Sequence, residues 1–269
     1  MIRLLQPTDR EAALAYGYRH ERENMFLIGS LSRAGGTPFD DNIYIGGWKE
    51  GVLCGIGTYF GRFKSLVVHA QENAVLQEIT DAFVELNVAI EWIPALKRFA
   101  LPTTQRLRER RGQEPKQVRE ETFFLLRKED FTDHSTPEVR QATPADVDEV
   151  LALEALADGE EGSTVAITDG DRRRIVPEYE FLLRKDGILV STAATQAVSE
   201  HYAQLGGIAT RPDRRGKGFA KQTVSAACRY WIERGKDILL FCKNDNAPAI
   251  AVYTAIGFRP IDEFRVIRY

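Results

Sequence analysis

Hydrophobic and polar positions in the second half of the chain predict helices and strands in alternation. Apolar residues recur at helical spacing from Val147 to Leu156, and Thr143, Pro144 and Asp146 just before them are typical of a helix start. The tripeptide Lys185-Asp186-Gly187 predicts a hairpin turn, since glycine accepts a positive φ. The predicted elements around and after it are strands Phe181–Leu183, Ile188–Thr195 and Ala203–Thr210, helix Gly216–Arg234, strand Ile238–Cys242, helix Ala247–Ile256 and a strand near Phe264–Tyr269.

Parts of this pattern recur in the first half. Four residues keep one spacing, with Arg3, Pro7, Asp9 and Leu14 corresponding to Arg140, Pro144, Asp146 and Leu151. The hairpin piece Lys49-Glu50-Gly51 corresponds to Lys185-Asp186-Gly187 in nearly the same register. Two matches in one register favour an internal duplication. Residues 128–142 are rich in charge, Pro and Thr and predict a linker. We therefore expect two domains, 1–132 and 138–269, each an α/β layer with a mostly antiparallel mixed sheet flanked by helices.

Composition excludes some classes of protein. A net charge of −3 disfavours a general nucleic-acid-binding surface. No apolar run is long enough to span a bilayer, and the first residues do not resemble a signal peptide. The three cysteines (Cys54, Cys228 and Cys242) lack metal-ligand spacing, which favours buried thiols in a reducing compartment. We expect a cytoplasmic protein without a metal.

The main candidate for chemistry is the turn Arg214-Arg215-Gly216-Lys217-Gly218, between a predicted strand and a predicted helix. A helix N-terminus carries unsatisfied N–H donors and partial positive charge, so it binds phosphate groups. Glycines let the backbone approach the phosphate oxygens. The alternative is a solvated basic turn. Neither a P-loop nor a complete dinucleotide fingerprint is present.

Two segments of the second half resemble hallmarks of the GNAT superfamily of N-acyltransferases. Gly207 to Ala220 is similar to its acyl-CoA-binding motif, although Asp213 replaces a frequent Gln or Arg. Asn246 to Phe258 is similar to its second motif, with an Asn, a Tyr and a closing Gly-Phe. The pair stands in the family's order. The resemblance implies tandem GNAT-like domains, with the catalytic domain at 138–269.

The resemblance also implies a cosubstrate, acetyl-CoA, and the residues that hold it. The implied contacts are Ile208, Ala209, Thr210, Arg214, Arg215, Gly216, Lys217, Gly218, Phe219, Ala220 and Asn246. Tyr253 would be the general acid that protonates the departing thiolate. The structural alternatives are that Tyr253 packs under Phe258 and that Asn246 only caps its helix.

The acceptor and the general base are less clear. Asp158, Glu160 and Glu161 form an acidic loop that would attract a cationic primary amine, or would simply be solvated. His201 and Tyr202 lie where relatives often carry a Glu that acts as the general base. His201 also fits a surface residue, and a chain of waters could carry the proton instead.

The first half has no counterpart of the glycine-rich turn. The corresponding segment, Val67 to Ala74, lacks glycine, Arg and Lys, and Glu72 would repel a phosphate. We therefore expect residues 1–132 to be a degenerate GNAT-like domain. The sequence predicts an N-acetyltransferase acting on a small-molecule or peptide amine, without a membrane or nucleic-acid partner and with an undetermined oligomeric state. The rival hypothesis is a non-catalytic acyl-CoA sensor with a regulatory first half.

Overall fold

The computed structural model describes residues 1–32, 38–157, 172 and 175–269, and these residues form two compact units. The first unit contains residues 1–123 and 261–269, and the second contains residues 124–260. The chain therefore leaves the first unit once and returns to it at its end. No helix in the described ranges is both long and apolar enough to cross a membrane.

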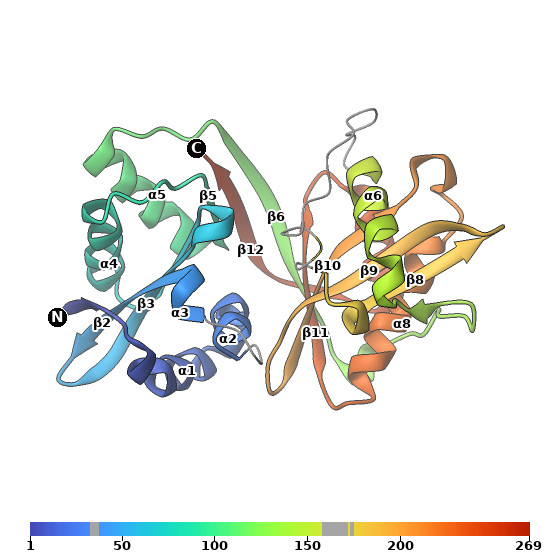
Figure 1. Ribbon diagram of the computed structural model, residues 1–269, viewed down its shortest axis with the longest axis horizontal. Helices are drawn as coiled ribbons and strands as arrows, with labels where there is room; N and C mark the ends of the chain where they lie inside the picture. Colours follow the sequence, from blue (N-terminus) through green and yellow to red (C-terminus); the bar gives the residue numbers. More distant parts are fainter. Residues whose placement is uncertain (33–37, 158–171, 173–174) are drawn as a thin grey trace. The chain divides into compact units, whose positions relative to one another are not determined.

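The first unit is a mostly antiparallel sheet with helices on both faces (Figure 1). Its strand order is β1-β2-β3-β4-β5-β12, and within the described residues β4 and β5 are its one parallel pair. The strands are β1 (Ile2–Leu4), β2 (Asn42–Lys49), β3 (Val52–Phe60), β4 (Ser65–Ala70), β5 (Trp92–Leu96) and β12 (Arg259–Arg268). The helices are α1 (Arg10–Arg19), α2 (Met25–Ser32), α3 (Pro38–Asp41), α4 (Asn73–Glu85) and α5 (Lys97–Arg111).

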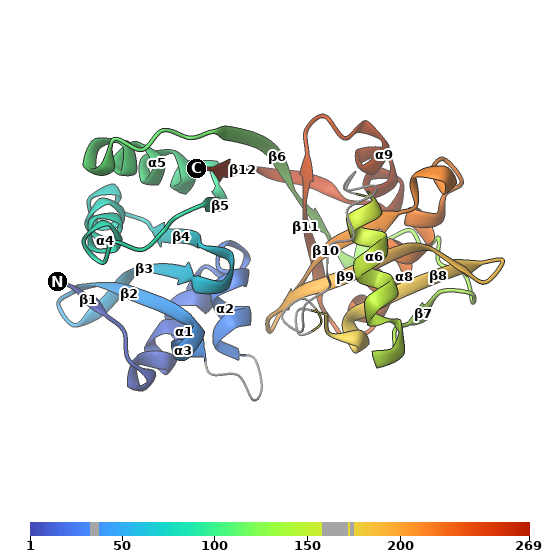
Figure 2. The same cartoon turned by 45° about the horizontal axis from the view of Figure 1, so that its top comes forward.

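The second unit has the same plan, with strand order β6-β11-β10-β9-β8-β7 (Figure 2). Helices α6 and α8 pack on separate apolar clusters of the sheet, one built around Val150 and Leu182 and the other around Val224 and Leu205. The strands are β6 (Gln117–Leu126), β7 (Arg140–Gln141), β8 (Glu180–Lys185), β9 (Ile188–Val198), β10 (Tyr202–Thr210) and β11 (Asp237–Lys243). The helices are α6 (Val147–Ala157), α8 (Phe219–Ile232) and α9 (Ala247–Ile256). This is the mixed α/β fold with a mostly antiparallel sheet that the sequence predicts.

The repeated residues have the same geometry in both units. Arg3 Nη2 lies 2.7 Å from Asp9 Oδ1, and Arg140 Nη2 lies 2.7 Å from Asp146 Oδ1. Each aspartate also accepts a hydrogen bond at 2.8 Å from a backbone N–H three residues earlier, which completes a capping box. Both helix starts are thus fixed in the same way.

The two hairpins correspond residue by residue as well. Glu50 and Gly51 have φ of +49° and +79°, and Asp186 and Gly187 have φ of +53° and +77°. Each hairpin also carries one register irregularity at the same place, after Gly47 in β2 and after Leu183 in β8. Such agreement supports the duplication, because a bulge and a turn with two positive φ values are unlikely to coincide in unrelated hairpins.

The structure differs from the predicted elements in three places. The predicted linker contains β7, which pairs with β8 through Arg140 and Gln141. The helix predicted from Gly216 begins at Phe219, because Gly216 and Gly218 have positive φ. The final strand, predicted near Phe264–Tyr269, begins at Arg259 as β12 and pairs with β5 of the first unit, while the compact units divide the chain at 123/124. Local sequence patterns do not report which strand a terminal segment pairs with.

Candidate functional site

Strands β10 and β11 of the second unit separate along their length. Within the described chain they pair in parallel only where Tyr202 to Gln204 meets Asp237 to Leu239. β10 then continues to Thr210 with a register irregularity against β9 between Gly206 and Ala209, where Gly207 has a φ of +55°. A bulge bends its strand. The sheet therefore offers an unpaired edge of β10 on the way to the glycine-rich turn.

The turn after β10 presents a row of backbone donors. Gly216 and Gly218 have φ of +76° and +75°, and α8 starts directly after them. The backbone N–H groups from Gly216 to Lys221 donate to no backbone acceptor in the described chain, and the first such bond of the helix runs from Gln222 N to Gly218 O at 3.3 Å. A Cβ on either glycine would meet nothing within 4 Å, so the positive φ is what demands glycine there and the space before the donors is open.

The basic side chains of the turn differ in their contacts. Arg215 is held by the backbone, with Nη2 donating to Ala157 O at 3.0 Å and Nε to Thr210 O at 3.3 Å. Arg214 lies 3.4 Å from Asp213, whose pKa is lowered because the hydrogen bond and charge of Arg211 outweigh the raising effect of burial. Lys217 is exposed and has no polar partner in the described residues. Lys217 is thus the cation best placed to meet an incoming phosphate.

A small buried hydroxyl cluster fixes the turn to the sheet. Ser191 Oγ donates to Ala209 O at 3.0 Å and lies 3.1 Å from the hydroxyls of Thr210 and Thr223. Thr223 belongs to α8 and Thr210 ends β10, so these contacts join both sides of the turn. The donor row is therefore held on a rigid support rather than on a free loop.

The second sequence motif forms α9 and its ends. Asn246 caps the helix, because its side chain accepts a hydrogen bond from Ala249 N at 3.2 Å. Tyr253 is buried, with its ring 5.8 Å from that of Phe258 and 6.2 Å from that of Phe124. The structure thus shows Asn246 capping its helix and Tyr253 packing against Phe258, as the two structural alternatives describe.

Comparison with known proteins matches this unit to a family. A model of the FR47-like protein family, which is GNAT-like, matches residues 183–267, the segment that carries β9 to β12 and the turn. Over this segment the chain is therefore similar to a GNAT-like family.

Known GNAT structures share the fold along the whole chain. An acetyltransferase of the GNAT family from Colwellia psychrerythraea has a TM-score of 0.62 and 11% identity, covering 100% of this chain and 99% of that one. A tandem GNAT protein from the clavulanic acid biosynthesis pathway has a TM-score of 0.60 and 13% identity, covering 100% and 98%. Identities this low describe the fold alone.

Two curated relatives are named mycothiol acetyltransferase. The one from Saccharomonospora viridis is 40% identical over 52 residues, which are 19% of this chain and 17% of the relative. The one from a Nocardioides species is 27% identical over 156 residues, which are 48% of this chain and 51% of the relative. The matches span about half the length of these relatives or less.

The residues predicted to border the acceptor are spread out. His201 is exposed and 4.0 Å from Glu200, and Tyr202 begins β10 in the part still paired with β11. Both therefore lie where β10 and β11 are still paired or just before that point, several residues from the bulge. Asp158, Glu160 and Glu161 lie outside the described residues.

A carboxylate that the sequence reading overlooked lies closer to the bulge. Glu154 is on the inner face of α6, and a Cβ built on Gly207 would be only 2.8 Å from Glu154 Oε1. This oxygen is shielded from solvent. The missing Cβ of Gly207 is what leaves room for it. The sequence did hold a sign of this carboxylate, because Glu154 directly follows Val150, Leu151 and Leu153 on a helix whose apolar residues are buried.

The first unit lacks the donor row at the corresponding place. Only Gln71 and Glu72 separate β4 from α4, and Glu72 forms an ion pair with Lys49. The segment has no glycine with a positive φ, and the carboxylate of Glu72 lies just before the helix start. The two units thus share a scaffold and differ in the connection from strand to helix.

Proposed function

We propose that the second unit is an acetyl-CoA-dependent N-acetyltransferase and that the first unit binds no cofactor. The observation that carries this proposal is the pairing of two features in one unit: an opened edge of β10 and a row of unused backbone N–H groups beginning at Gly216. The first suits the extended pantetheine arm, which would pair with the main chain of Ile208 and Thr210. The second suits a pyrophosphate.

The side chains near the turn would complete the cofactor site. Lys217 would add charge to the phosphate contacts, while Arg215 would hold the turn in shape through Ala157 and Thr210. The Asn246 side chain would use its amide N–H group on the cofactor while its oxygen caps α9. The residues around the turn therefore fit acetyl-CoA, which would supply the activated acetyl group.

Two residues would handle the protons of the reaction. The acceptor amine attacks the thioester carbonyl, the C–S bond breaks, the amine loses a proton and the thiolate gains one. Glu154, beside Gly207 at the bulge, would take the proton from the amine. Tyr253 would donate a proton to the thiolate. A carboxylate suits the acceptance of a proton from the amine, and a phenol suits the donation of a proton to the thiolate.

The acceptor is proposed to be a cationic primary amine. The support is the acidic loop with Asp158, Glu160 and Glu161, which would concentrate cations. Two relatives act, by name, on mycothiol, so amines that carry a thiol belong among the compounds to be tried. Replacing the three acidic residues together with their amides should raise the KM for the acceptor and leave the cofactor's KM unchanged.

The test combines calorimetry with a screen of amines for acetyl-CoA-dependent release of free thiol. Acetyl-CoA should bind once per chain, and at least one amine should support turnover. Tyr253→Phe should lower kcat by about 10²-fold or more while acetyl-CoA affinity is kept. Tyr230→Phe, a change of the same kind on α8, is the matched control and should retain activity.

Each alternative has its own outcome in these measurements. Binding of two acetyl-CoA molecules per chain would refute a degenerate first unit. Tight binding without turnover on any amine would favour an acyl-CoA sensor over an enzyme. An unchanged kcat in Tyr253→Phe would remove Tyr253 from the mechanism and leave its ring as packing against Phe124 and Phe258.

A further inference from the structure

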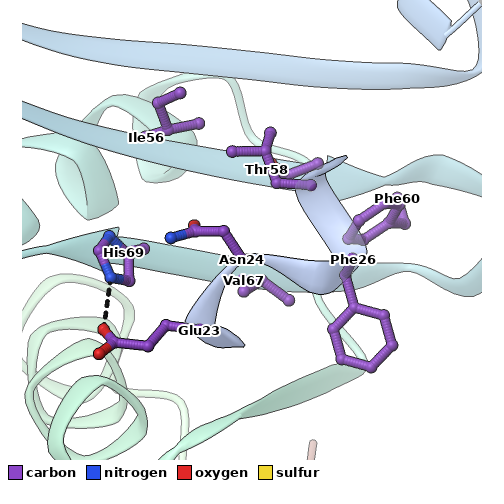
Figure 3. Close-up of a pocket in the computed structure, with 9 residues that line it drawn as sticks. Glu23, Asn24, Phe26, Ile56, Thr58, Phe60, Val67 and His69 are labelled. Atoms are coloured by element: carbon purple, nitrogen blue, oxygen red, sulfur yellow. Dashed lines mark hydrogen bonds and ion pairs between the residues drawn. The ribbon is translucent and has the colours of Figure 1, made fainter. Parts of the chain in front are cut away.

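A compact polar cluster lies between the end of α1 and strand β4 in the first unit. It contains Tyr16 and His20 at the end of α1, Glu23 in the short helical turn that follows and His69 on β4. One ligating atom each from His20, Glu23 and His69 lie within 4.8 Å of one another. Figure 3 shows the His69 ring and the Glu23 carboxylate facing each other beside the side chain of Asn24.

The fold itself does not require polar residues at these positions. The spacing that relates Arg3 to Arg140 also relates Tyr16 and His20 to Leu153 and Ala157. On the strands, His69 pairs with β3 at the position where Ala209 pairs with β9, so these two residues correspond as well. Leu153, Ala157 and Ala209 belong to or pack on one apolar cluster. The same contact between helix and strand is therefore made in one unit by apolar side chains and in the other by a phenol and two imidazoles.

The contacts of Tyr16 favour one tautomer of His69. Tyr16 Oη lies 2.6 Å from His69 Nδ1 and 3.1 Å from the carbonyl oxygen of His69. Both contacts are satisfied together when Nδ1–H donates to the phenol oxygen and the phenol donates to the carbonyl. Nε2 is then a lone pair, and it faces Glu23 Oε2 at 2.8 Å. In the other tautomer this contact is a hydrogen bond from Nε2–H to Glu23, whereas in this one a cation shared by the lone pair and the carboxylate would satisfy it.

The surroundings match those of a metal ligand set. A histidine that ligates through Nε2 commonly donates its other N–H to a fixed partner, as His69 can to Tyr16. The second oxygen of Glu23 is bound at 2.8 Å by Arg98, whose guanidinium also pairs with Asp262. This arrangement keeps the carboxylate ionised and oriented. A pocket lined by Glu23, Asn24 and His69 adjoins the cluster and has room for about one water molecule.

We propose that His20, Glu23 and His69 bind a divalent transition-metal ion, zinc above all, with a water molecule as the fourth ligand. Two imidazoles and one carboxylate form a donor set that zinc uses with an open position. Zinc bonds of about 2.0–2.1 Å place tetrahedral ligands roughly 3.3 Å apart, so the pair His69 and Glu23 would open by roughly half an ångström. The ion would join the end of α1 to β4.

Charge and burial agree with this assignment. Burial lowers the pKa of His69 despite the raising effect of Glu23, which favours the neutral, ligating imidazole. The charged groups facing the cluster in the described chain are Glu23, Arg98 and Arg19, which lies over the Tyr16 ring, with Asp262 behind Arg98. The two arginines are balanced by two carboxylates, so a divalent ion enters a region without excess positive charge. The proposal is independent of acetyl transfer, since it concerns the other unit.

The test measures zinc binding by the full chain after treatment with a chelator and its removal. Calorimetry with Zn²⁺ should show one saturable site, and Co²⁺ should give a visible absorption band of a low-coordinate nitrogen and oxygen site. His20→Ala and Glu23→Gln should each weaken Zn²⁺ binding by at least 10-fold. Tyr16→Phe, which removes only the positioning group, should weaken it by about 10-fold or more. His134→Ala, at an imidazole that contacts only the carbonyl of Ala255, is the control.

Folding must be monitored because His69 is buried against Phe99. Circular dichroism and thermal unfolding of His20→Ala and Glu23→Gln should match the metal-free wild type, and Zn²⁺ should raise the melting temperature of the wild type alone. The proposal is overturned if the wild type shows no saturable Zn²⁺ binding. It is equally overturned if folded His20→Ala and Glu23→Gln bind Zn²⁺ as the wild type does.

Discussion

The two units use one backbone plan for different chemistry, and the differences fall at two places. The first is the connection from strand to helix, which has two residues after β4 and eight after β10. The longer connection contains both glycines with positive φ and the start of the row of N–H groups that have no backbone acceptor in the described chain. Capping boxes, hairpin turns and strand register are shared. A duplicated scaffold can therefore keep its frame while its copies differ in the connection proposed to bind phosphate.

The second place is the inner face of the first helix in each unit. Gly17 of α1 and His20, which directly follows α1, correspond to Glu154 and Ala157 of α6. A side chain at Gly17 would meet Ile28 Cγ1 at 2.9 Å, so the first unit has no room for a counterpart of Glu154. In the second unit the carboxylate has space beside Gly207. The segments thus bring different polar groups to the sheet, Glu154 in the second unit and Tyr16 with His20 in the first.

The largest effect should come from removing the carboxylate that only the second unit has. Glu154→Gln keeps the size of the side chain and should lower kcat/KM by about 10²–10⁴-fold, because general-base assistance is lost. Acetyl-CoA affinity should stay within about twofold. Glu178→Gln, at an exposed glutamate of the same unit, is the control. Wild-type turnover in Glu154→Gln would show that Glu154 is not the general base, and the proposed functional difference between α6 and α1 would be refuted.

A smaller effect should distinguish the two capping boxes. Asp146 is buried and bound by Arg140, Thr143 and Arg184, which hold its pKa far below the usual range, whereas hydrogen bonds from Arg3 and Gln6 lower the pKa of Asp9 to about 2. Asp146→Asn should cost about 2–4 kcal/mol of unfolding free energy, and Asp9→Asn about 1–2 kcal/mol after allowing for solvent screening of Arg3. Urea unfolding measures both.

The acid dependence of these carboxylates follows from the direction of their pKa shifts. A lowered folded-state pKa means that the stabilisation is complete above the unfolded value near pH 4 and is lost as the pH falls. For Asp9 the loss should occur between about pH 4 and pH 2. In Asp9→Asn the unfolding free energy should depend less on pH in this range. An unchanged acid profile would show that the Arg3–Asp9 contact contributes nothing in solution.

The smallest difference is expected at the hairpins, where the two units are most alike. Gly51→Ala and Gly187→Ala each place a Cβ at a φ near +78°, with no other atom within 4 Å. Only backbone strain should matter, so each should cost about 1–2 kcal/mol, and the two costs should agree within about 0.5 kcal/mol. Thermal or urea unfolding checks this. Unequal costs would argue that the hairpins differ in rigidity despite their common geometry.

The sequence predicted the elements of the second unit because their signals are local. Helix Ala247–Ile256 is confirmed at both ends, since Asn246 caps it and Gly257, at a φ of +112°, ends it. The helix before it was predicted to start too early because apolar spacing continues through a turn whose glycines are not helical. The short strand β7 was not predicted, because Arg140 and Gln141 show no alternation of polar and apolar residues. They form a strand because β8 lies beside them.

By itself, the sequence indicated the duplicated frame, the glycine-rich turn and the resemblance to the GNAT motifs, because each depends on residues close together in the chain. Tertiary structure decided which groups meet across the fold. It placed Glu154 against Gly207 and brought His20, Glu23 and His69 together, although the expectation of no metal had rested on cysteine spacing alone. It also assigned β12 to the sheet of the first unit. Such contacts depend on packing between distant segments, and no local pattern of side chains records that packing.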